Sequence, residues 1–174
     1  MATYDPSRAE CFVYTFKEGV LSALAHDLKL RVSGFSVEID EQTHAIDARF
    51  DARSLRVVCA MQHGAEAPSS LKDSQEREIE GNIVDDVLHA RRHPEIRFRS
   101  SSVTPEGEGF RIAGTLSLHG VDRTLETVAR RQGDRLVVEA ELHQPDYGIK
   151  PYRAMMGTLK IKPRLRVQLS VPAG

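Results

Sequence analysis

A histidine and an aspartate stand side by side in the stretch GVLSALAHDLKL, residues 19–30, where the next charge is Lys29. An imidazole beside a carboxylate is a pairing that general bases use. Adjacent residues on an extended strand point to opposite faces, so His26 and Asp27 are poorly placed to hydrogen-bond to each other. We therefore expect this pair to begin a strand, with contact to a ligand's polar head as the alternative role.

Two further histidines, His89 and His93, are four residues apart, a spacing that can bring two imidazoles to one metal ion on a helix. The sequence around them argues against this use. His93 precedes a proline, the HExxH pattern is missing, and Arg91 and Arg92 complement the dipole at a helix end without any metal. We predict no metal site here.

The sequence also lacks the motifs of serine nucleophiles and of phosphate-binding loops. The sequence has no GxSxG elbow for a serine nucleophile, and its glycine-rich stretch PEGEGF is acidic and unsuited to phosphate. A formal net charge of -1 gives no electrostatic reason to expect nucleic acid as a partner. The basic positions from Lys160 to Arg166 are interpreted as a solvated outer face. We expect no catalytic residues, no cofactor and no nucleic-acid partner.

The length of 174 residues fits one domain that includes the whole chain. The start MATYDPSRAE does not resemble a signal peptide, and no run of 18 apolar residues suggests a transmembrane segment. The two cysteines, Cys11 and Cys59, lie far apart and outside any CxxC motif, which suits a reducing compartment. We therefore expect a cytoplasmic protein without a disulfide.

Alternation of apolar and polar residues is the clearest structural signal. In TLKIKPRLRVQLSV the odd positions from Leu159 to Val171 are apolar except Pro163, and most even positions are charged or polar. This period of two predicts a strand with one buried face, bent or bulged at Pro163. Similar alternation recurs in several other stretches, among them ECFVYTF, HDLKLRV, GFSVEID, AIDARFDA, EIRFRSSSV, FRIAGTLSL, TLETVAR and RLVVEAEL. Short strands at regular spacing predict an antiparallel sandwich or barrel.

Two segments depart from this alternation. The apolar parity changes between HDLKLRV and GFSVEID, with Gly34 at the change, so we expect a bulge or sharp bend there. Residues 72–92 instead show apolar residues at helical spacing, Ile79, Ile83 and Val87, before Pro94. They predict one amphipathic helix, which could cover an end of a barrel.

Three stretches, taken in order, resemble the YceI-like family of lipocalin-like, polyisoprenoid-binding proteins. They are LAHDLKLRVSGFSVEI, HPEIRFRSSSV and GTLSLHGVDRTLETVA, and DYGIKPYRAMMGTLKIK resembles the family's closing segment. The similarity extends from about residue 9 to residue 171. It implies a mainly β, antiparallel lipocalin-like barrel of about eight strands. Its apolar interior would bind an amphipathic isoprenoid or quinone-like lipid.

The site residues expected for such a ligand fall into two groups. Strand parity places one group on the inward face: Leu28, Leu30, Phe50, Phe98, Ile112, Leu116, Leu118, Val138 and Leu142. The resemblance implies polar anchors at the mouth with two flexible apolar neighbours: His26, Asp27, Tyr147, Tyr152, Met155 and Met156.

Three functions stay open at this point. We favour non-enzymatic binding, carriage or sequestration of a lipid inside the barrel. The first alternative is an interaction module with a filled barrel core, which would form a homodimer through an outer sheet face. The second is a stress-linked accessory enzyme that uses its histidines. Alternation alone cannot separate a filled core from a hollow one. For the enzyme alternative, His119 lies next to Gly120 and is expected to stabilise a turn.

Overall fold

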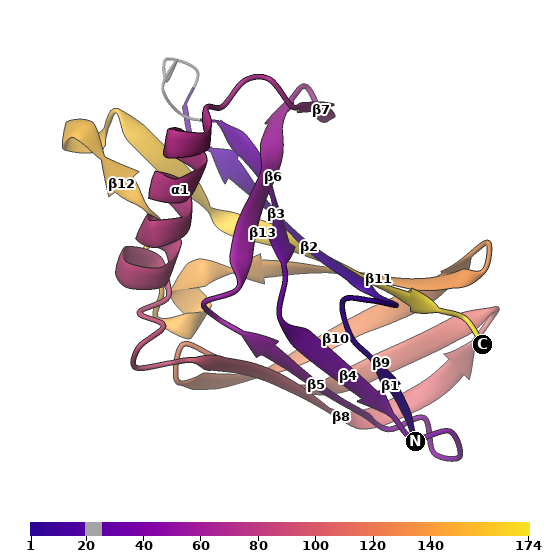
Figure 1. Ribbon diagram of the computed structural model, residues 1–174. Helices are drawn as coiled ribbons and strands as arrows, with labels where there is room; N and C mark the ends of the chain where they lie inside the picture. Colours follow the sequence, from indigo (N-terminus) through magenta and orange to yellow (C-terminus); the bar gives the residue numbers. More distant parts are fainter. Residues whose placement is uncertain (20–25) are drawn as a thin grey trace.

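Thirteen strands form one curled antiparallel sheet in residues 1–19 and 26–174, the part of the chain that the computed structural model describes (Figure 1). The strands are β1 (Ala2–Tyr4), β2 (Glu10–Lys17), β3 (Asp27–Val32), β4 (Phe35–Ile39), β5 (Ile46–Asp51), β6 (Leu55–Gln62), β7 (Ala65–Ala67), β8 (Glu95–Glu106), β9 (Gly109–Leu118), β10 (Val121–Gln132), β11 (Arg135–His143), β12 (Arg153–Ala154) and β13 (Leu159–Pro172). Neighbours pair in the order β1-β4-β5-β8-β9-β10-β11-β13-β2-β3-β6-β7, with β12 on β13.

The sheet curls because two ribbons bend and continue. The chain passes from β3 into β4 at Gly34, and from β5 into β6 at residues 52–54. At this corner Ser33 N donates to Ser54 O (2.9 Å) and Asp51 N donates to Gly34 O (2.9 Å). If β3–β4 and β5–β6 are each counted as one bent strand, and strands of three residues or fewer are left out, the barrel has eight strands. The predicted mainly β, antiparallel barrel-like fold is confirmed.

Both predicted irregularities are present. Leu28, Leu30 and Val32 are buried before the bend, and Phe35 and Val37 after it, so the inward parity changes at Gly34 as expected. In β13 the register with β2 shifts between Ile161 and Leu165, on either side of Pro163.

Strand β6 lies outside the strands that alternation indicated. Its residues 57–60, Val-Val-Cys-Ala, are all apolar. Val58 is an extra residue in the pairing with β3, so the strand is bulged and does not alternate regularly. The helical segment α1 packs on β6. A bulged strand that is covered by a helix does not have one polar face and one apolar face. Its sequence therefore lacks the alternation by which the other strands were recognised.

The helix is shorter than the predicted 72–92. α1 spans Asp73–Asn82 and continues through a π-helical turn, η1 (Ile83–Val87), in which Leu88 N donates to Ile83 O. His89 then has φ +46°, which ends the helix five residues before Pro94. The apolar stripe of Ile79, Ile83 and Val87 does pack against the core, as its spacing predicts. Two short 3-10 turns complete the chain, η2 (Gln144–Tyr147) and η3 (Met155–Gly157).

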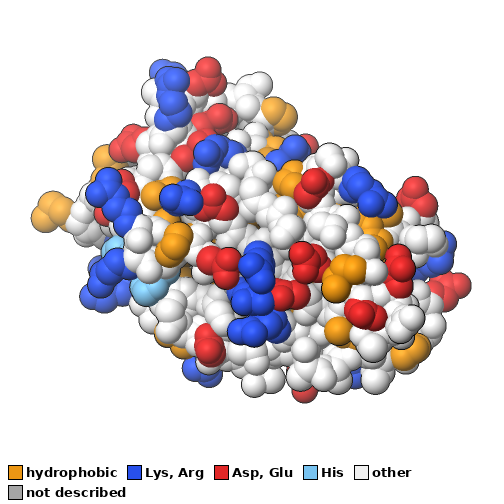
Figure 2. All heavy atoms as spheres, turned by 60° about the horizontal axis from the view of Figure 1, so that its bottom comes forward, with side chains coloured by type: hydrophobic (Ala, Val, Ile, Leu, Met, Phe, Trp, Pro, Cys, Tyr) orange, Lys and Arg blue, Asp and Glu red, His pale blue; other side chains and the backbone are white. Residues whose placement is uncertain are grey.

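The outer face of the sheet carries charges of both signs. Asp47 on β5 accepts from Arg97 on β8 (Oδ2 to Nη2, 2.6 Å), and Figure 2 shows acidic and basic side chains intermixed on the face turned forward. Within the described residues, no helix combines the length and the apolar character needed to cross a bilayer.

Gly81 offers a simple test of the helix. A Cβ built at Gly81 meets no atom within 4 Å, and its φ is not positive. Gly81→Ala is therefore expected to raise the free energy of unfolding by about 0.5–1 kcal/mol, because alanine restricts the unfolded chain more than glycine. Urea unfolding followed by circular dichroism measures this change, and a destabilised variant would mean that α1 is not helical at this position.

Candidate functional site

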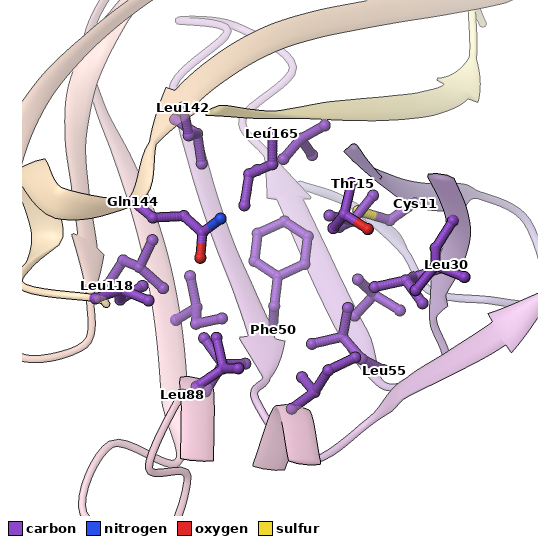
Figure 3. Close-up of a pocket in the computed structure, with 18 of the residues that line it drawn as sticks. Cys11, Thr15, Leu30, Phe50, Leu55, Leu88, Leu118, Leu142, Gln144 and Leu165 are labelled. Carbon is purple, nitrogen blue, oxygen red and sulfur yellow. The ribbon is translucent and has the colours of Figure 1, made fainter. Parts of the chain in front are cut away.

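A cavity of about 540 Å³ occupies the interior of the curled sheet and reaches α1 (Figure 3). Its wall comes from the inward faces of nearly every long strand, completed by the apolar stripe of α1 and η1. Leu30, Ala48 and Leu116 are typical wall residues, each less than 9% exposed. The interior is therefore hollow and mainly apolar, and the filled core that alternation left open is not what the structure shows.

The mouth of the cavity can be located from the exposure of its lining. Gln75 and Glu78 of α1 and Met155 of η3 line the cavity and are also exposed to solvent. Half-buried Asn82 lies beside them, and its side-chain nitrogen donates to the Tyr152 hydroxyl (3.0 Å). The opening thus lies between α1 and the segment around β12, which are neighbours at one end of the molecule in Figure 1.

Strand parity placed the apolar residues well. All nine residues expected on the inward face line the cavity: Leu28, Leu30, Phe50, Phe98, Ile112, Leu116, Leu118, Val138 and Leu142. The structure fixes where these side chains lie, and their contact with a ligand stays a prediction.

The histidine and aspartate of HDLKL separate at the start of β3. His26 lines the cavity, whereas Asp27 is not part of the lining. The Asp27 Oδ1 accepts a hydrogen bond from Lys17 N (2.7 Å), which ties the start of β3 to the end of β2. Their opposite directions follow from the strand geometry. Asp27 is therefore a structural residue in this position, and His26 is the one that can meet a ligand.

Of the other residues expected at the mouth, two line the cavity and two do not. Tyr152 and Met155 line the cavity. Tyr147 is buried in η2 at 4% exposure but is not part of the lining, and Met156 is fully exposed. Met155 and Met156 both have left-handed φ values, +53° and +58°, so the chain turns at this point and the two side chains diverge. Periodicity could not reveal this, since the segment is neither helix nor strand.

Two polar wall residues escaped the sequence analysis. Thr15 shares the inward parity of Cys11 and Val13 on β2, so alternation in ECFVYTF could have found it. Gln144 is only 4% exposed and lines the cavity from η2, a turn whose side-chain directions no sequence period predicts. Its amide nitrogen donates to Lys162 O (3.1 Å).

A model of the YceI-like domain matches residues 5–173, nearly the whole chain. The chain belongs to the YceI-like family. Its recognition from the sequence is thereby confirmed.

Solved structures share this YceI-like fold at low sequence identity. BcnA of Burkholderia cenocepacia is 12% identical, with 94% of each chain covered and a TM-score of 0.64. A polyisoprenoid-binding domain from Saccharophagus degradans, implicated in plant cell wall breakdown, is 12% identical over 94% of this chain and 91% of that one, with a TM-score of 0.60. The Campylobacter jejuni YceI protein is 15% identical over 77% of each chain, with a TM-score of 0.52. No curated protein sequence matches the chain.

Three histidines of this YceI-like chain cluster outside the cavity lining. The His119 ring lies 4.7 Å from that of His93 and 5.5 Å from that of His89, measured between centroids. His119 Nδ1 lies 3.1 Å from Tyr147 O and must be the donor, because a carbonyl only accepts. His119 and Gly120 both have positive φ, +54° and +74°, and form the turn between β9 and β10. His119 thus fastens this turn to η2.

The stability of the YceI-like barrel is expected to fall below about pH 6.5 because of His119. Burial lowers the pKa of His119 below its ordinary 6.5, and His93, His89 and Arg92 act in the same direction, whereas the hydrogen bond that His119 donates to Tyr147 O acts against them. Between the lowered pKa and 6.5 the unfolded chain binds a proton that the folded chain does not. The free energy of unfolding therefore decreases as the pH falls through that window, by at most about 1.4 kcal/mol per pH unit.

The measurement is urea unfolding between pH 5 and pH 8, with His119→Asn as the test variant, since asparagine accepts a left-handed φ. The slope below pH 6.5 should flatten in this variant. His63→Asn is the matched control, because His63 also precedes a glycine in a left-handed hairpin turn (φ +53°) but is exposed. Equal flattening in both variants would show that burial of His119 is not the cause.

Within the described residues, no group of three or more histidine, cysteine or acidic side chains could hold a metal ion. Both cysteines are free and buried. Cys11 lines the cavity, and burial raises its pKa to about 12, so its thiol stays protonated and behaves as a small apolar side chain.

Proposed function

We propose that this YceI-like chain binds an elongated apolar or amphipathic lipid, such as an isoprenoid, inside the barrel, and carries or sequesters it without catalysing a reaction. The observation that carries this proposal is the hollow interior of about 540 Å³, walled almost entirely by apolar side chains. Each CH₂ group that leaves water for such a wall contributes about 0.8 kcal/mol, so a chain of a few isoprene units could bind without directed polar contacts. The Saccharophagus degradans domain with the same fold is described as polyisoprenoid-binding, which supports the choice of ligand class.

The arrangement of titratable groups supports binding over catalysis. The cavity lining includes His26, Asp51 and Glu78, which come from three separate parts of the fold. No hydrogen bond joins any two of them within the described residues. A nucleophile or general base needs a partner within hydrogen-bonding reach, and these groups do not provide one for each other. For the compartment we propose the cytosol, where two free buried thiols stay reduced.

Native mass spectrometry of the protein purified from its own host tests the proposal. We expect an apolar molecule of defined mass to accompany the chain and to be recovered by organic extraction. The apo protein should then take up added farnesol in a one-to-one complex. A clean apo mass together with no uptake of any isoprenoid would overturn the proposal. The same spectra report whether the chain forms the homodimer considered above.

A further inference from the structure

The polar groups of the cavity carry information about the ligand's head group, beyond its apolar chain. Among them, the uncharged ones are of two kinds: side chains deep in the wall, represented by Thr15 and Gln144, and side chains at the mouth, represented by Gln75, Asn82 and Tyr152. Figure 3 shows Thr15 and Gln144 on opposite sides of the cavity, each among apolar neighbours.

The Thr15 hydroxyl forms no hydrogen bond with any residue that the structure describes. Thr15 lines the cavity from β2 among apolar neighbours, and its oxygen is covered by the side chains around it. Leaving a buried hydroxyl unpaired costs about 1–3 kcal/mol, so the fold gains nothing from threonine over valine at this place. A rotation about χ1 that brings the hydroxyl to the cavity surface would give it a ligand oxygen as the missing partner.

Gln144 presents an acceptor to the same space. Because its amide nitrogen is used by Lys162 O (3.1 Å), the side chain is held in one orientation, and Figure 3 shows its carbonyl oxygen turned toward the apolar wall. A carbonyl oxygen accepts hydrogen bonds and repels anions. This group fits a hydroxyl or another neutral donor of the ligand.

The carboxylate of the lining at the mouth is Glu78, and His26 is a lining residue with a titratable imidazole. Asp51 is also a lining residue, but its side chain is 43% exposed and its Oδ1 lies 3.2 Å from Arg53 Nε. Hydrogen bonding from Arg53 lowers the pKa of Asp51, so this carboxyl is ionised at neutral pH. No lysine or arginine is part of the lining among the residues that the structure describes, and residues 20–25, VLSALA, contain none in the sequence.

Two basic residues of the β12–β13 hairpin, which lies beside the mouth, face away from the cavity. Ala154 of β12 and Leu159 of β13 are paired and both line the cavity, while the adjacent pair is Arg153 and Lys160. Neighbouring residues on a strand point to opposite sides, so these two cations lie on the other face of the β12–β13 hairpin.

From these observations we propose that the cavity selects lipids with an uncharged head group that can donate a hydrogen bond, such as a polyprenol, over anionic lipids of the same chain, such as polyprenyl phosphates or fatty acids. This inference rests on the proposed function and narrows its ligand class. An anionic head would meet Glu78 at the mouth or the Gln144 carbonyl inside, and neither position offers the cation that a desolvated anion requires.

A competition assay with matched ligands tests the selection. Farnesol, farnesyl phosphate and farnesene share one hydrocarbon chain and differ in the head group, which is a hydroxyl, a phosphate or absent. Each is tested for displacement of an environment-sensitive fluorescent probe from the 174-residue protein at neutral pH, where the phosphate carries more than one negative charge. We expect farnesol to bind about tenfold or more tighter than farnesyl phosphate.

Glu78→Lys tests the electrostatic part of this selection. The variant places a cation at the mouth, so farnesyl phosphate should bind about fivefold or more tighter than to the unmodified protein, with little change for farnesene. Glu80→Lys is the matched control, because it makes the same charge change on the same helix outside the cavity lining. A gain of equal size in Glu80→Lys would show a general effect of net charge and would count against a head-group site at the mouth.

Thr15→Val tests the hydrogen-bonding part. Valine has nearly the same shape but no hydroxyl, so farnesol should lose about fivefold in affinity while farnesene is unaffected. Thr124→Val, the same change at an exposed position of β10, is the control. Equal binding of farnesol by Thr15→Val and the unmodified protein would remove Thr15 from the site.

The panel separates the two proposals. Binding of farnesyl phosphate as tightly as farnesol would overturn the selection for an uncharged head, while lipid binding in the barrel would stand. Failure of all three ligands to displace the probe would overturn the proposed function itself.

Discussion

Ala140→Trp is expected to lower the affinity for an isoprenoid by about tenfold or more while the barrel stays folded. Ala140 lies on β11 between Val138 and Leu142, and all three line the cavity. An indole ring at this position would occupy part of the space of about 540 Å³ that the ligand chain needs. Displacing only two CH₂ groups of the ligand from the wall removes about 1.6 kcal/mol, which corresponds to about a tenfold loss.

The stability of this variant should move in the opposite direction from its affinity. The indole fills empty apolar space, and cavity-filling substitutions commonly add about 0.5–2 kcal/mol to the free energy of unfolding. Thermal unfolding without ligand and probe displacement by farnesol measure the two effects on the same sample.

Ala113→Trp is the matched control for Ala140→Trp. Ala113 is half-buried on β9 between the inward residues Ile112 and Gly114, so its side chain belongs to the outer face, and it is not part of the cavity lining. The affinity of the Ala113→Trp variant for farnesol should stay within about twofold of that of the unmodified protein, since the indole ring does not enter the cavity. If Ala140→Trp folded normally and bound farnesol as well as Ala113→Trp, the ligand would have to bind elsewhere than in the barrel interior.

Much of the wall could be predicted because strands impose a strict period of two. Once one inward residue such as Leu116 is assigned, every second residue of its strand follows, and neighbouring strands must present the same apolar face to the core. The same logic predicted the bend at Gly34, since a change of parity in a continuous ribbon requires one. Alternation could not say whether the enclosed space is filled, because that depends on how far the strands curl and where α1 lies.

The predictions that the structure corrects lie in turns and at the helix end, where the periodic pattern of apolar residues stops. Tyr147 and Met156 were placed at the mouth, but a 3-10 turn and two left-handed residues set their directions instead. The helix was extended to residue 92 because Pro94 was taken as its end, whereas the left-handed His89 ends it earlier. Gln144 was missed for the same reason as Tyr147, since its burial depends on η2 docking against β13.

Gly114 shows how the wall depends on close approach between strands. It is buried on β9, at an inward position between Ile112 and Leu116, and it pairs with Ser100 of β8. A Cβ built at Gly114 would lie 2.3 Å from Arg99 O and 2.6 Å from Cζ of Phe98. The missing side chain therefore lets the Phe98 ring lie over β9 as part of the cavity wall.

Gly114→Ala is accordingly expected to lower the free energy of unfolding by about 2–4 kcal/mol, because a backbone oxygen in a paired strand cannot yield as a flexible side chain does. Displacing the Phe98 ring should also narrow the cavity, so farnesol affinity should fall in the protein that remains folded. Gly81→Ala is the natural control, since it makes the same chemical change where no atom lies within 4 Å. Urea unfolding of both variants measures the contrast. A loss below about 1 kcal/mol in Gly114→Ala would mean that β8 and β9 separate easily, and then the wall of the cavity would be more adaptable than the close packing of Phe98 on Gly114 implies.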